Sequence, residues 1–448
     1  MPSLVLAGLL FVTNWQDAGA RAQGTVDLKA HAAALVASLL AKDFSAVEEQ
    51  FDDKMKAAWP PGRLAANWEA RLGQVGAFAR CGTDVRVRNI ADKTMVITPC
   101  AFARARLDIQ LAFDTAARIS GLVFRPAAAP PVAYTAPAYA NPAAYGDEEV
   151  TVGSGEWALP GTLSLPGGPG PFPAAVLVAG SGPNDRDETI GSNKPLKDLA
   201  AGLASRGIAV LRYDKRTKVH GPALAAVADF TVKQEVVDDV LEAVRLLRAN
   251  PKIDRARVFV VGHSLGGMLI PRIGAADPAL AGLIVMAGPA RSIEDAVLDQ
   301  TRYLAMADGT ITPEEQGRID EAARLVTKVQ ALTPPDAKNA GNIFGAPASY
   351  WLDLRGYDAP SAAKALTQPL LVLQGERDYQ VTMAEFERWK RSLAGRGRVT
   401  FHSYPELNHL FIAGTGKSLP LEYETPGHVA EPVIRDLATW ILKPGSGL

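Results

Sequence analysis

The chain has 448 residues, of which 48% are hydrophobic and 21% are charged, and its formal net charge is −1. This length allows two domains or one large one, and the composition is ordinary for a soluble globular protein. Because acids and bases are interleaved and nearly balanced, the chain offers no electrostatic footprint for nucleic acid or for an anionic membrane. The composition therefore argues against nucleic-acid binding.

The N-terminus carries an apolar run at positions 4–12 (LVLAGLLFV), which is too short to span a bilayer. Ala20-Arg21-Ala22 then offers a small-x-small cleavage site. Together these features predict a signal peptide over residues 1–22 and a periplasmic or secreted protein. No Lys or Arg precedes the run, so the alternative is an N-terminal helix on a cytoplasmic protein. No other segment is apolar enough for a membrane span.

Residues 23–125 predict a small α+β domain. Apolar residues recur at helical spacing from Leu28 to Leu72, with a break at Pro60-Pro61. From position 77 onward the period changes to two, which predicts strands near 83–90, 93–99, 105–113 and 118–124. Helices followed by an antiparallel meander are typical of this class.

The two cysteines, Cys81 and Cys100, flank a turn-like stretch at 89–93. A turn centred there would place them nearly opposite each other on paired strands. A disulfide is then geometrically feasible, and an oxidising compartment would preserve it. Two free buried thiols remain the alternative, because a sequence supplies no Cα distances.

Residues 126–147 are rich in Pro and Ala and have no apolar period, so they predict a linker. Beyond it, residues 148–448 predict a catalytic domain that opens with a hairpin (148–152 and 156–165). Strands are expected at 174–178, 209–213, 258–261, 282–286, 369–373 and 400–404, and helices at 196–206, 232–248, 268–275, 383–393 and 429–442. Such alternation predicts an α/β fold with a mostly parallel sheet. The mainly helical stretch at 288–366, which has no strand signal, predicts a lid.

The most informative motif is Gly262-His263-Ser264-Leu265-Gly266, which follows an apolar strand and precedes a helix. Strand, sharp turn and helix form a nucleophile elbow, with the serine at the apex of the turn. Gly262 and Gly266 lack Cβ atoms and allow strand and helix to approach closely. The motif therefore predicts Ser264 as the nucleophile.

A serine nucleophile needs a base and an acid, and in this architecture they follow it in the order acid, then histidine. Asp378 lies on the loop after the strand at 369–373, and Glu376 is the alternative acid. His409 follows the next strand, and His428, at the start of the last helix, is its rival. We expect Asp378 and His409, because each lies just past a strand end. We do not expect His263 to be the base, because it is the direct neighbour of the nucleophile.

The oxyanion hole should use the N–H of Leu265 and one from the loop after the first parallel strand, where Ser181 is the candidate. The acids of this loop, Asp185, Asp187 and Glu188, are expected to pair with cations. The cations expected to pair with these acids are Lys215 and Arg216. No pattern of ligands with metal spacing accompanies the acids, so no metal is expected.

With these residues in place, the chain resembles the α/β-hydrolase superfamily, and within it bacterial esterases of the dienelactone-hydrolase and prolyl-oligopeptidase-like branch. The resemblance covers roughly 148–442 and rests on the segments 180–187 (GSGPNDRD), 212–216 (RYDKR), 262–267 (GHSLGG), 375–378 (GERD) and 408–409 (NH). It implies a Ser264–Asp378–His409 triad, no cofactor, and hydrolysis of small-molecule esters, typically with short acyl chains. The loop has Ala179-Gly180 where the superfamily commonly has His-Gly. The front domain resembles a small module of unknown function that precedes such hydrolases.

Other functions use the same residues. A peptidase or an acyltransferase would need the same triad, and a non-catalytic binding protein could retain the fold. The acyl-chain preference depends on tertiary contacts of the lid, where Tyr350 and Trp351 either line the pocket or fill the lid core. The sequence leaves open whether the protein forms a homo-oligomer.

Overall fold

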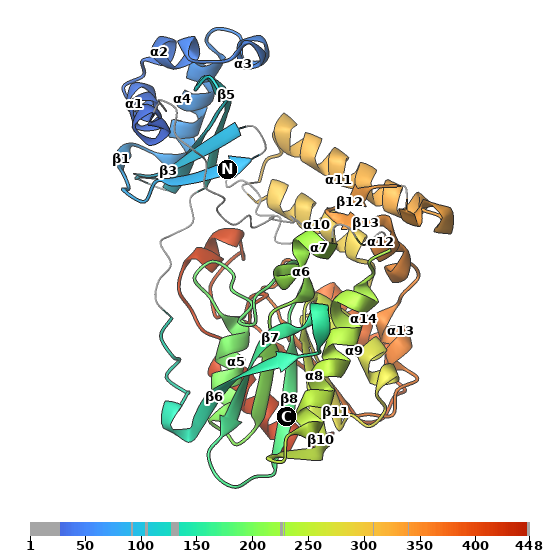
Figure 1. Ribbon diagram of the computed structural model, residues 1–448. Coiled ribbons are helices and arrows are strands. Elements are labelled where there is room, and N and C mark those ends of the chain that lie inside the picture. Colours follow the sequence, from blue (N-terminus) through green and yellow to red (C-terminus); the bar gives the residue numbers. More distant parts are fainter. Residues whose placement is uncertain are drawn as a thin grey trace. The chain divides into compact units, whose positions relative to one another are not determined.

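The computed structural model describes residues 27–90, 93–103, 106–126, 134–224, 227, 229–307, 309–338 and 340–445. The described residues fall into two compact units, with 27–126 in an N-terminal unit and 134–445 in a C-terminal unit (Figure 1). The predicted signal peptide, residues 1–22, lies outside the described residues. No helix in the described part of the chain combines the length and apolarity that crossing a membrane requires.

The N-terminal unit consists of four helices followed by an antiparallel sheet. The helices are α1 (Leu28–Leu40), α2 (Phe44–Glu49), α3 (Asp53–Ala58) and α4 (Arg63–Val75). The strands are β1 (Phe78–Cys81), β2 (Arg86–Ile90), β3 (Lys93–Phe102), β4 (Arg106–Phe113) and β5 (Ile119–Pro126). They pair in the order β1-β3-β4-β5, with β2 also on β3. Strand β1 was not expected, because its largely exposed residues give no apolar alternation.

The core of this unit lies between the helices and one face of the sheet. Its largest fully buried side chains are Trp68, Phe51, Phe113, Leu39 and Ile109. Cys81 of β1 lies opposite Cys100 of β3, and the two form a disulfide. Of the two alternatives that the sequence left open, the structure therefore contains the bonded pair.

The C-terminal unit is built on an eight-stranded sheet in the order β15-β14-β11-β10-β8-β9-β7-β6. Its strands are β6 (Tyr145–Val152), β7 (Leu159–Pro166), β8 (Phe172–Val178), β9 (Ala209–Tyr213), β10 (Ile253–His263), β11 (Gly282–Met286), β14 (Leu370–Gly375) and β15 (Val399–Tyr404). The pairs from β9 to β15 are parallel, whereas β6 and β7 are antiparallel to their neighbours. The carboxyl ends of β8, β10, β14 and β15 therefore meet at one edge.

Helices cover both faces of this sheet (Figure 1). On one face lie α5 (Pro195–Ala204) and α15 (Glu431–Leu442), and on the other α8 (Asp238–Ala249), α9 (Leu265–Ala276) and α14 (Met383–Ser392). Alternate residues of a strand point to opposite faces, so Val258 and Val260 pack toward α8 and α9, while Phe259 and Val261 pack toward α15. This arrangement confirms the predicted α/β-hydrolase sheet and the separate α+β unit.

The insertion after β11 contains α10 (Ile293–Ala305), α11 (Pro313–Ala331), α12 (Ala348–Leu354) and α13 (Ala359–Ala363). The expectation that it has no strand is wrong, because β12 (Asn342–Ile343) and β13 (Ala346–Pro347) form a short hairpin. Two residues per strand are too few for a period-two signal. Two other short helices, α6 (Arg216–Val219) and α7 (Gly221–Leu224), follow β9.

Two further boundaries differ from the expectations. Strand β6 begins at Tyr145, inside the segment predicted as a linker, and the Tyr139 hydroxyl of that segment donates to the carbonyl of Val429 at 2.8 Å. The helix expected at 232–248 is not uniform, because it begins with a π-helical turn, η3 (Lys233–Val237), before α8. Apolar periodicity does not distinguish a single π turn from an α-helix.

Candidate active site

Ser264 occupies the turn between β10, which ends at His263, and α9, which begins at Leu265. Its φ of 53° and ψ of −118° lie in a region that costs a non-glycine residue about 1–3 kcal/mol. A Cβ atom on Gly262 would lie 2.3 Å from the carbonyl oxygen of Gly266, so strand and helix can approach this closely only with glycine there. The backbone thus has the geometry of the nucleophile elbow that the motif predicts.

The loops after β14 and β15 bring Asp378 and His409 together. Nδ1 of His409 lies 2.6 Å from Oδ2 of Asp378, and both side chains are buried. Oδ1 of Asp378 accepts the backbone N–H groups of Gln380 and Val381 at 2.8 and 3.0 Å, and Oδ2 accepts an Nε2–H of Gln374 at 3.1 Å. Because an ionised carboxylate only accepts, Nδ1 carries the proton and Nε2 remains available as a base.

The rival acid and the rival base lie in other pairs. The Glu376 carboxylate accepts the hydroxyl of Ser403 at 2.8 Å. Nδ1 of His428 faces Asp198 at 3.1 Å, on the side of the sheet that α5 covers. Neither residue contacts the acid and base described above.

The segment of Ser264 and the loop of His409 are in direct contact. Nε2 of His263, the residue before Ser264, lies 2.9 Å from the carbonyl oxygen of His409, and the two imidazole rings are 4.7 Å apart between centroids. Ser264 Oγ forms no hydrogen bond with any residue that the structure describes. Such contacts often tighten only when substrate is bound.

The predicted oxyanion loop passes beside the nucleophile. A Cβ atom on Gly180 would lie 3.0 Å from Cβ of Ser264 and 3.5 Å from its Oγ. The Gly180 carbonyl accepts Nζ–H of Lys215 at 2.8 Å and Nδ2–H of Asn184 at 3.1 Å. In a trans peptide the next N–H points away from the carbonyl, so these two donors fix the direction of the Ser181 N–H.

The second predicted donor, the N–H of Leu265, belongs to the first turn of α9. First-turn N–H groups have no acceptor within their own helix, and the helix dipole adds partial positive charge there. Leu265 directly follows Ser264 in the chain, and Gly180, the neighbour of Ser181, approaches the Ser264 side chain. The assignment of the Leu265 and Ser181 N–H groups as oxyanion donors stays a prediction.

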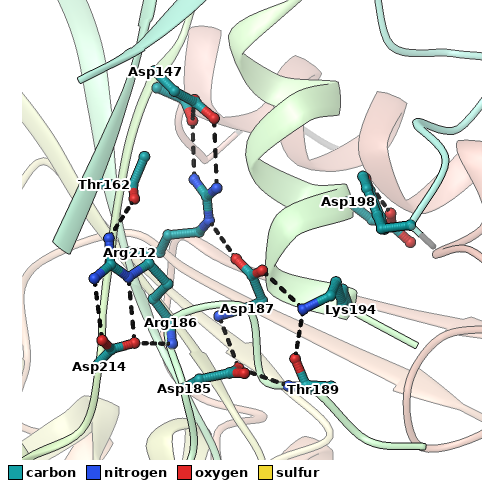
Figure 2. Close-up of polar contacts among 12 residues, drawn as sticks. Asp147, Thr162, Asp185, Arg186, Asp187, Thr189, Lys194, Asp198, Arg212 and Asp214 are labelled. Atoms are coloured by element: carbon teal, nitrogen blue, oxygen red, sulfur yellow. Dashed lines mark hydrogen bonds and ion pairs between the residues drawn. The ribbon is translucent and has the colours of Figure 1, made fainter. Parts of the chain in front are cut away.

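The later residues of the oxyanion loop take part in a charged network (Figure 2). Asp187 accepts Nε–H of Arg212 at 3.0 Å and Nζ–H of Lys194 at 3.1 Å. Burial acts to raise the pKa of Asp187, but the two cations hold it below its ordinary value. Arg186 donates to Asp214 through its backbone N–H at 2.7 Å and through its guanidinium. The loop is thereby fastened to β9 and to the turn after it.

The expected pairing of the loop's acids with Lys215 and Arg216 is wrong. Asp185 accepts backbone N–H groups of its own loop. Lys215 instead lies 3.2 Å from Glu235, and Arg216 pairs with Asp239. Burial raises the pKa of Asp239 to about 6, although the pairing with Arg216 acts to lower it. Lys215 contacts the loop through the Gly180 carbonyl rather than through an acid, and the carboxylates nearest to these two cations come from η3 and α8.

Glu235 connects the oxyanion loop to the insertion. It lies in η3 and accepts the hydroxyl groups of Thr217 at 2.9 Å and of Tyr350 at 2.8 Å, besides its ion pair with Lys215. Burial raises the pKa of Tyr350, and the adjacent carboxylate raises it further. Tyr350 is therefore a buried hydrogen-bond donor.

The second lid aromatic is also buried. The indole N–H of Trp351 donates to the carbonyl of Ile343 at 2.8 Å, and its ring packs on Phe344 and Tyr350. Trp351 also borders a cavity of about 450 Å³ within the insertion, next to Leu354 and Arg355. Both aromatic side chains are thus buried in the insertion, and Trp351 in addition borders its cavity.

Sequence reasoning missed the pairing of Glu188 with His263. Oε1 of Glu188 accepts the N–H of Gly180 at 2.6 Å, and both carboxylate oxygens lie 3.0 Å from Nδ1 of His263. Both side chains are buried. The chain separates the two residues by 75 positions, so only the place of His263 beside the nucleophile could have pointed to it.

This edge of the sheet carries a serine in a strained turn, a histidine that is hydrogen-bonded to an acid, and the first-turn N–H of Leu265. These are the kinds of group that acyl transfer to a serine requires. Among the described residues no group of three or more His, Cys, Asp or Glu side chains could hold a metal ion.

Comparison with known proteins agrees with this geometry. Residues 191–414 match the family described as serine aminopeptidase, S33, and residues 32–122 match a family of unknown function, DUF3887. Esterase EstD of Thermotoga maritima is 37% identical over 409 residues, which cover 91% of this chain and 94% of that protein. Monoacylglycerol lipase of Mycolicibacterium smegmatis is 28% identical over 190 residues, 42% of this chain and 66% of that protein.

Among solved structures, Est1E from Butyrivibrio proteoclasticus shares 15% identity with a TM-score of 0.43, covering 66% of this chain and 98% of that chain. The assignment itself rests on the family match and on the likeness to EstD along nearly the whole length of both chains. The chain therefore belongs to the α/β-hydrolase superfamily, among the carboxylic ester hydrolases related to EstD.

Proposed function

We propose that the protein is a serine carboxylesterase that hydrolyses short-chain acyl esters through an acyl-enzyme. The observation that carries the proposal is the 2.6 Å hydrogen bond between His409 and Asp378 at the sheet edge where Ser264 sits in its strained turn. Ester hydrolysis is supported by the relationship to EstD. The preference for short acyl chains rests on the resemblance to esterases of this branch.

In the first half of the reaction, Nε2 of His409 accepts the proton of Ser264 Oγ as Oγ bonds to the ester carbonyl carbon. The carbonyl oxygen becomes an oxyanion, which accepts the N–H groups of Ser181 and Leu265. Asp378 stabilises the imidazolium that has formed. When the tetrahedral intermediate collapses, the ester C–O bond breaks and His409 gives its proton to the departing alcohol.

In the second half, a water molecule attacks the acyl-enzyme and His409 takes a proton from it. The same two N–H groups hold the second oxyanion. Collapse of this intermediate breaks the bond to Ser264 Oγ, which recovers its proton from His409, and the carboxylic acid leaves. In both halves the protons move between Nε2 of His409 and an oxygen atom that is bonded, or becomes bonded, to the acyl carbon. A single base therefore serves both halves.

Fluorophosphonate labelling tests the nucleophile. We expect the purified protein to label at Ser264, and Ser264→Ala to lose both the label and hydrolysis of nitrophenyl esters, with a fall in kcat of about 10⁶-fold on the scale of serine proteases. A folded Ser264→Ala variant that still labels or turns over would refute the assignment.

A substrate panel tests the reaction. Nitrophenyl esters of rising acyl length should give the highest kcat/KM at the short end. Aminoacyl nitroanilides belong in the same panel, because the matching family is named for an aminopeptidase. Faster turnover of the anilides than of the esters would replace the esterase proposal by a peptidase.

We also propose that the protein is exported. The apolar run at 4–12, the cleavage site at 20–22 and the Cys81–Cys100 disulfide support this, because disulfides persist in oxidising compartments. Fractionation of the producing cells with N-terminal sequencing should find a chain that begins at Gln23 outside the cytoplasm. A full-length chain in the cytoplasm would contradict it.

A further inference from the structure

The hydrogen bonds of His263 determine its protonation. Its Nδ1 faces the carboxylate of Glu188, and its Nε2 faces the backbone carbonyl of His409. A carbonyl oxygen can only accept, so Nε2 must carry a proton. The Glu188 carboxylate also accepts the N–H of Gly180, and as an ionised group it requires a proton on Nδ1 as well. His263 is therefore an imidazolium paired with a carboxylate.

The electrostatics agree with this geometry. Burial opposes a charge on His263, but the attraction and the hydrogen bond of Glu188 raise its pKa above the ordinary value. For Glu188 burial again acts against the charge, and His263 holds its pKa below the ordinary value. His409 also acts to lower the pKa of Glu188, and Asp378 acts to raise that of His263. Lys215, hydrogen-bonded to the Gly180 carbonyl, is the nearby cation on the oxyanion loop.

The pair also connects the three segments that carry the proposed oxyanion donor, the nucleophile and the base, whose relative positions the reaction requires. Glu188 and Gly180 belong to the loop after β8, which carries the oxyanion donor. His263 is the last residue of β10, directly before the nucleophile. The carbonyl that His263 contacts belongs to His409 itself, on the loop after β15.

We propose that His263, held by Glu188, is a positioning residue that fixes the backbone of the catalytic base relative to the nucleophile and the oxyanion loop. This inference rests on the proposed function, since it assigns His409 as the base. His263 does not touch the reacting atoms. The Nε2–H of His263 binds the backbone carbonyl of His409 and so fixes the position of the His409 imidazole. The positive charge of His263 affects how readily the His409 imidazole accepts a proton.

Two variants separate position from charge. Glu188→Gln retains the shape, because its amide oxygen can accept the Gly180 N–H and its amide N–H can donate to Nδ1 of a neutral His263, whose Nε2–H still reaches His409. His263→Ala removes the donor to the His409 carbonyl together with the charge. His428→Ala is the matched control, since it also removes an imidazole from a buried carboxylate, that of Asp198.

We expect His263→Ala to lower the plateau kcat for nitrophenyl acetate by about 10- to 100-fold, because a displaced catalytic group loses about that much, with KM within about three-fold. Glu188→Gln should keep kcat within about three-fold of the wild type. His263→Ala should move the acid limb of the pH–kcat/KM profile upward by about half a pH unit, because a cation beside the base is lost while the Glu188 carboxylate remains. Glu188→Gln removes the charges of both partners, whose effects on the base oppose each other, so its acid limb should move less. His428→Ala should change neither kcat nor the acid limb.

A plateau kcat for His263→Ala within three-fold of the wild type, or an acid limb that moves in neither variant, would overturn the proposal. If His263→Ala does not fold, the double variant Glu188→Gln/His263→Asn, which buries no charge, takes its place with the same expected fall in kcat. Wild-type protein that fails to label at Ser264 would instead refute the proposed function, so the two failures are distinguishable.

Discussion

The two sides of Ser264 are stabilised by different kinds of interaction. On the oxyanion side, permanent charges hold the loop, through Arg212 with Asp187 and through Lys215 with Glu235. On the base side, the groups that hydrogen-bond to Asp378, apart from the imidazole, are neutral: two backbone N–H groups and the amide of Gln374.

This difference follows from what each side does in the proposed reaction. The oxyanion loop keeps the same charge throughout, so ion pairs can make it rigid without affecting the chemistry, and a rigid donor needs no reorganisation in the transition state. His409 gains and loses a charge in each half-reaction. The amide groups orient Asp378 without titrating, and the one ion that contacts the His409 loop, His263, is itself paired with the Glu188 carboxylate.

The largest effect should come from the acid on the base side. Asp378→Asn should lower kcat by about 10³- to 10⁴-fold, because an amide can donate to Nδ1 and so stabilise the wrong tautomer of His409. Steady-state hydrolysis of nitrophenyl acetate measures this. Glu376→Gln, at the rival acid, is the control and should stay within about three-fold. Equal losses in the two variants would contradict the assignment of the acid.

On the oxyanion side, Lys215→Met should lower kcat by about 10- to 100-fold, since the Gly180 carbonyl loses its cationic donor and the Ser181 N–H loses its fixed direction. It should also reduce the free energy of unfolding by about 3–5 kcal/mol, because Glu235 stays buried without its partner. Urea titration measures the second effect. Lys215→Met/Glu235→Gln should recover much of the stability but little of the kcat, and recovery of both would show that the loop needs no permanent charge.

A smaller loss is expected where a neutral donor on the base side is removed. Gln374→Leu takes one of three protein donors besides the imidazole from Asp378 and also frees the carbonyl of Val381. We expect kcat/KM to fall by about ten-fold, which corresponds to roughly 1.4 kcal/mol. Gln374→Glu is the informative companion, because it places a titratable acid beside Asp378. If it matched wild type across pH, neutrality on this side would not matter.

The smallest effect should come from Tyr350→Phe, which removes one hydrogen bond from Glu235 and leaves Thr217 and Lys215 in place. The free energy of unfolding should fall by about 1 kcal/mol, with kcat within about three-fold of the wild type. Thermal unfolding with a parallel assay checks both. A ten-fold loss of kcat would mean that the insertion controls the oxyanion loop more directly than these contacts indicate.

A feature could be predicted from the sequence where the residues that form it lie close together in the chain or follow the order of elements in the sheet. Ser264 could be proposed as the nucleophile because strand, motif and helix are contiguous, and the strand-end positions of Asp378 and His409 follow from the order of elements in a parallel sheet. The bonds of Glu188 to His263 and of Lys215 to Glu235 join segments far apart in the chain, and no spacing rule anticipates them. The acidic cluster was recognised, but the cations expected to pair with it, Lys215 and Arg216, pair with Glu235 and Asp239 instead.

The π-helical turn η3 has a consequence for the length of the chain there. A π turn holds one more residue than the α-helix that continues from it, and this extra residue sets the direction in which Glu235 points relative to α8. Deleting a single residue from 233–237 would let the helix run regularly and would turn Glu235 by about 100° away from Lys215. The direction of Glu235 therefore depends on the number of residues in this segment and not only on their types.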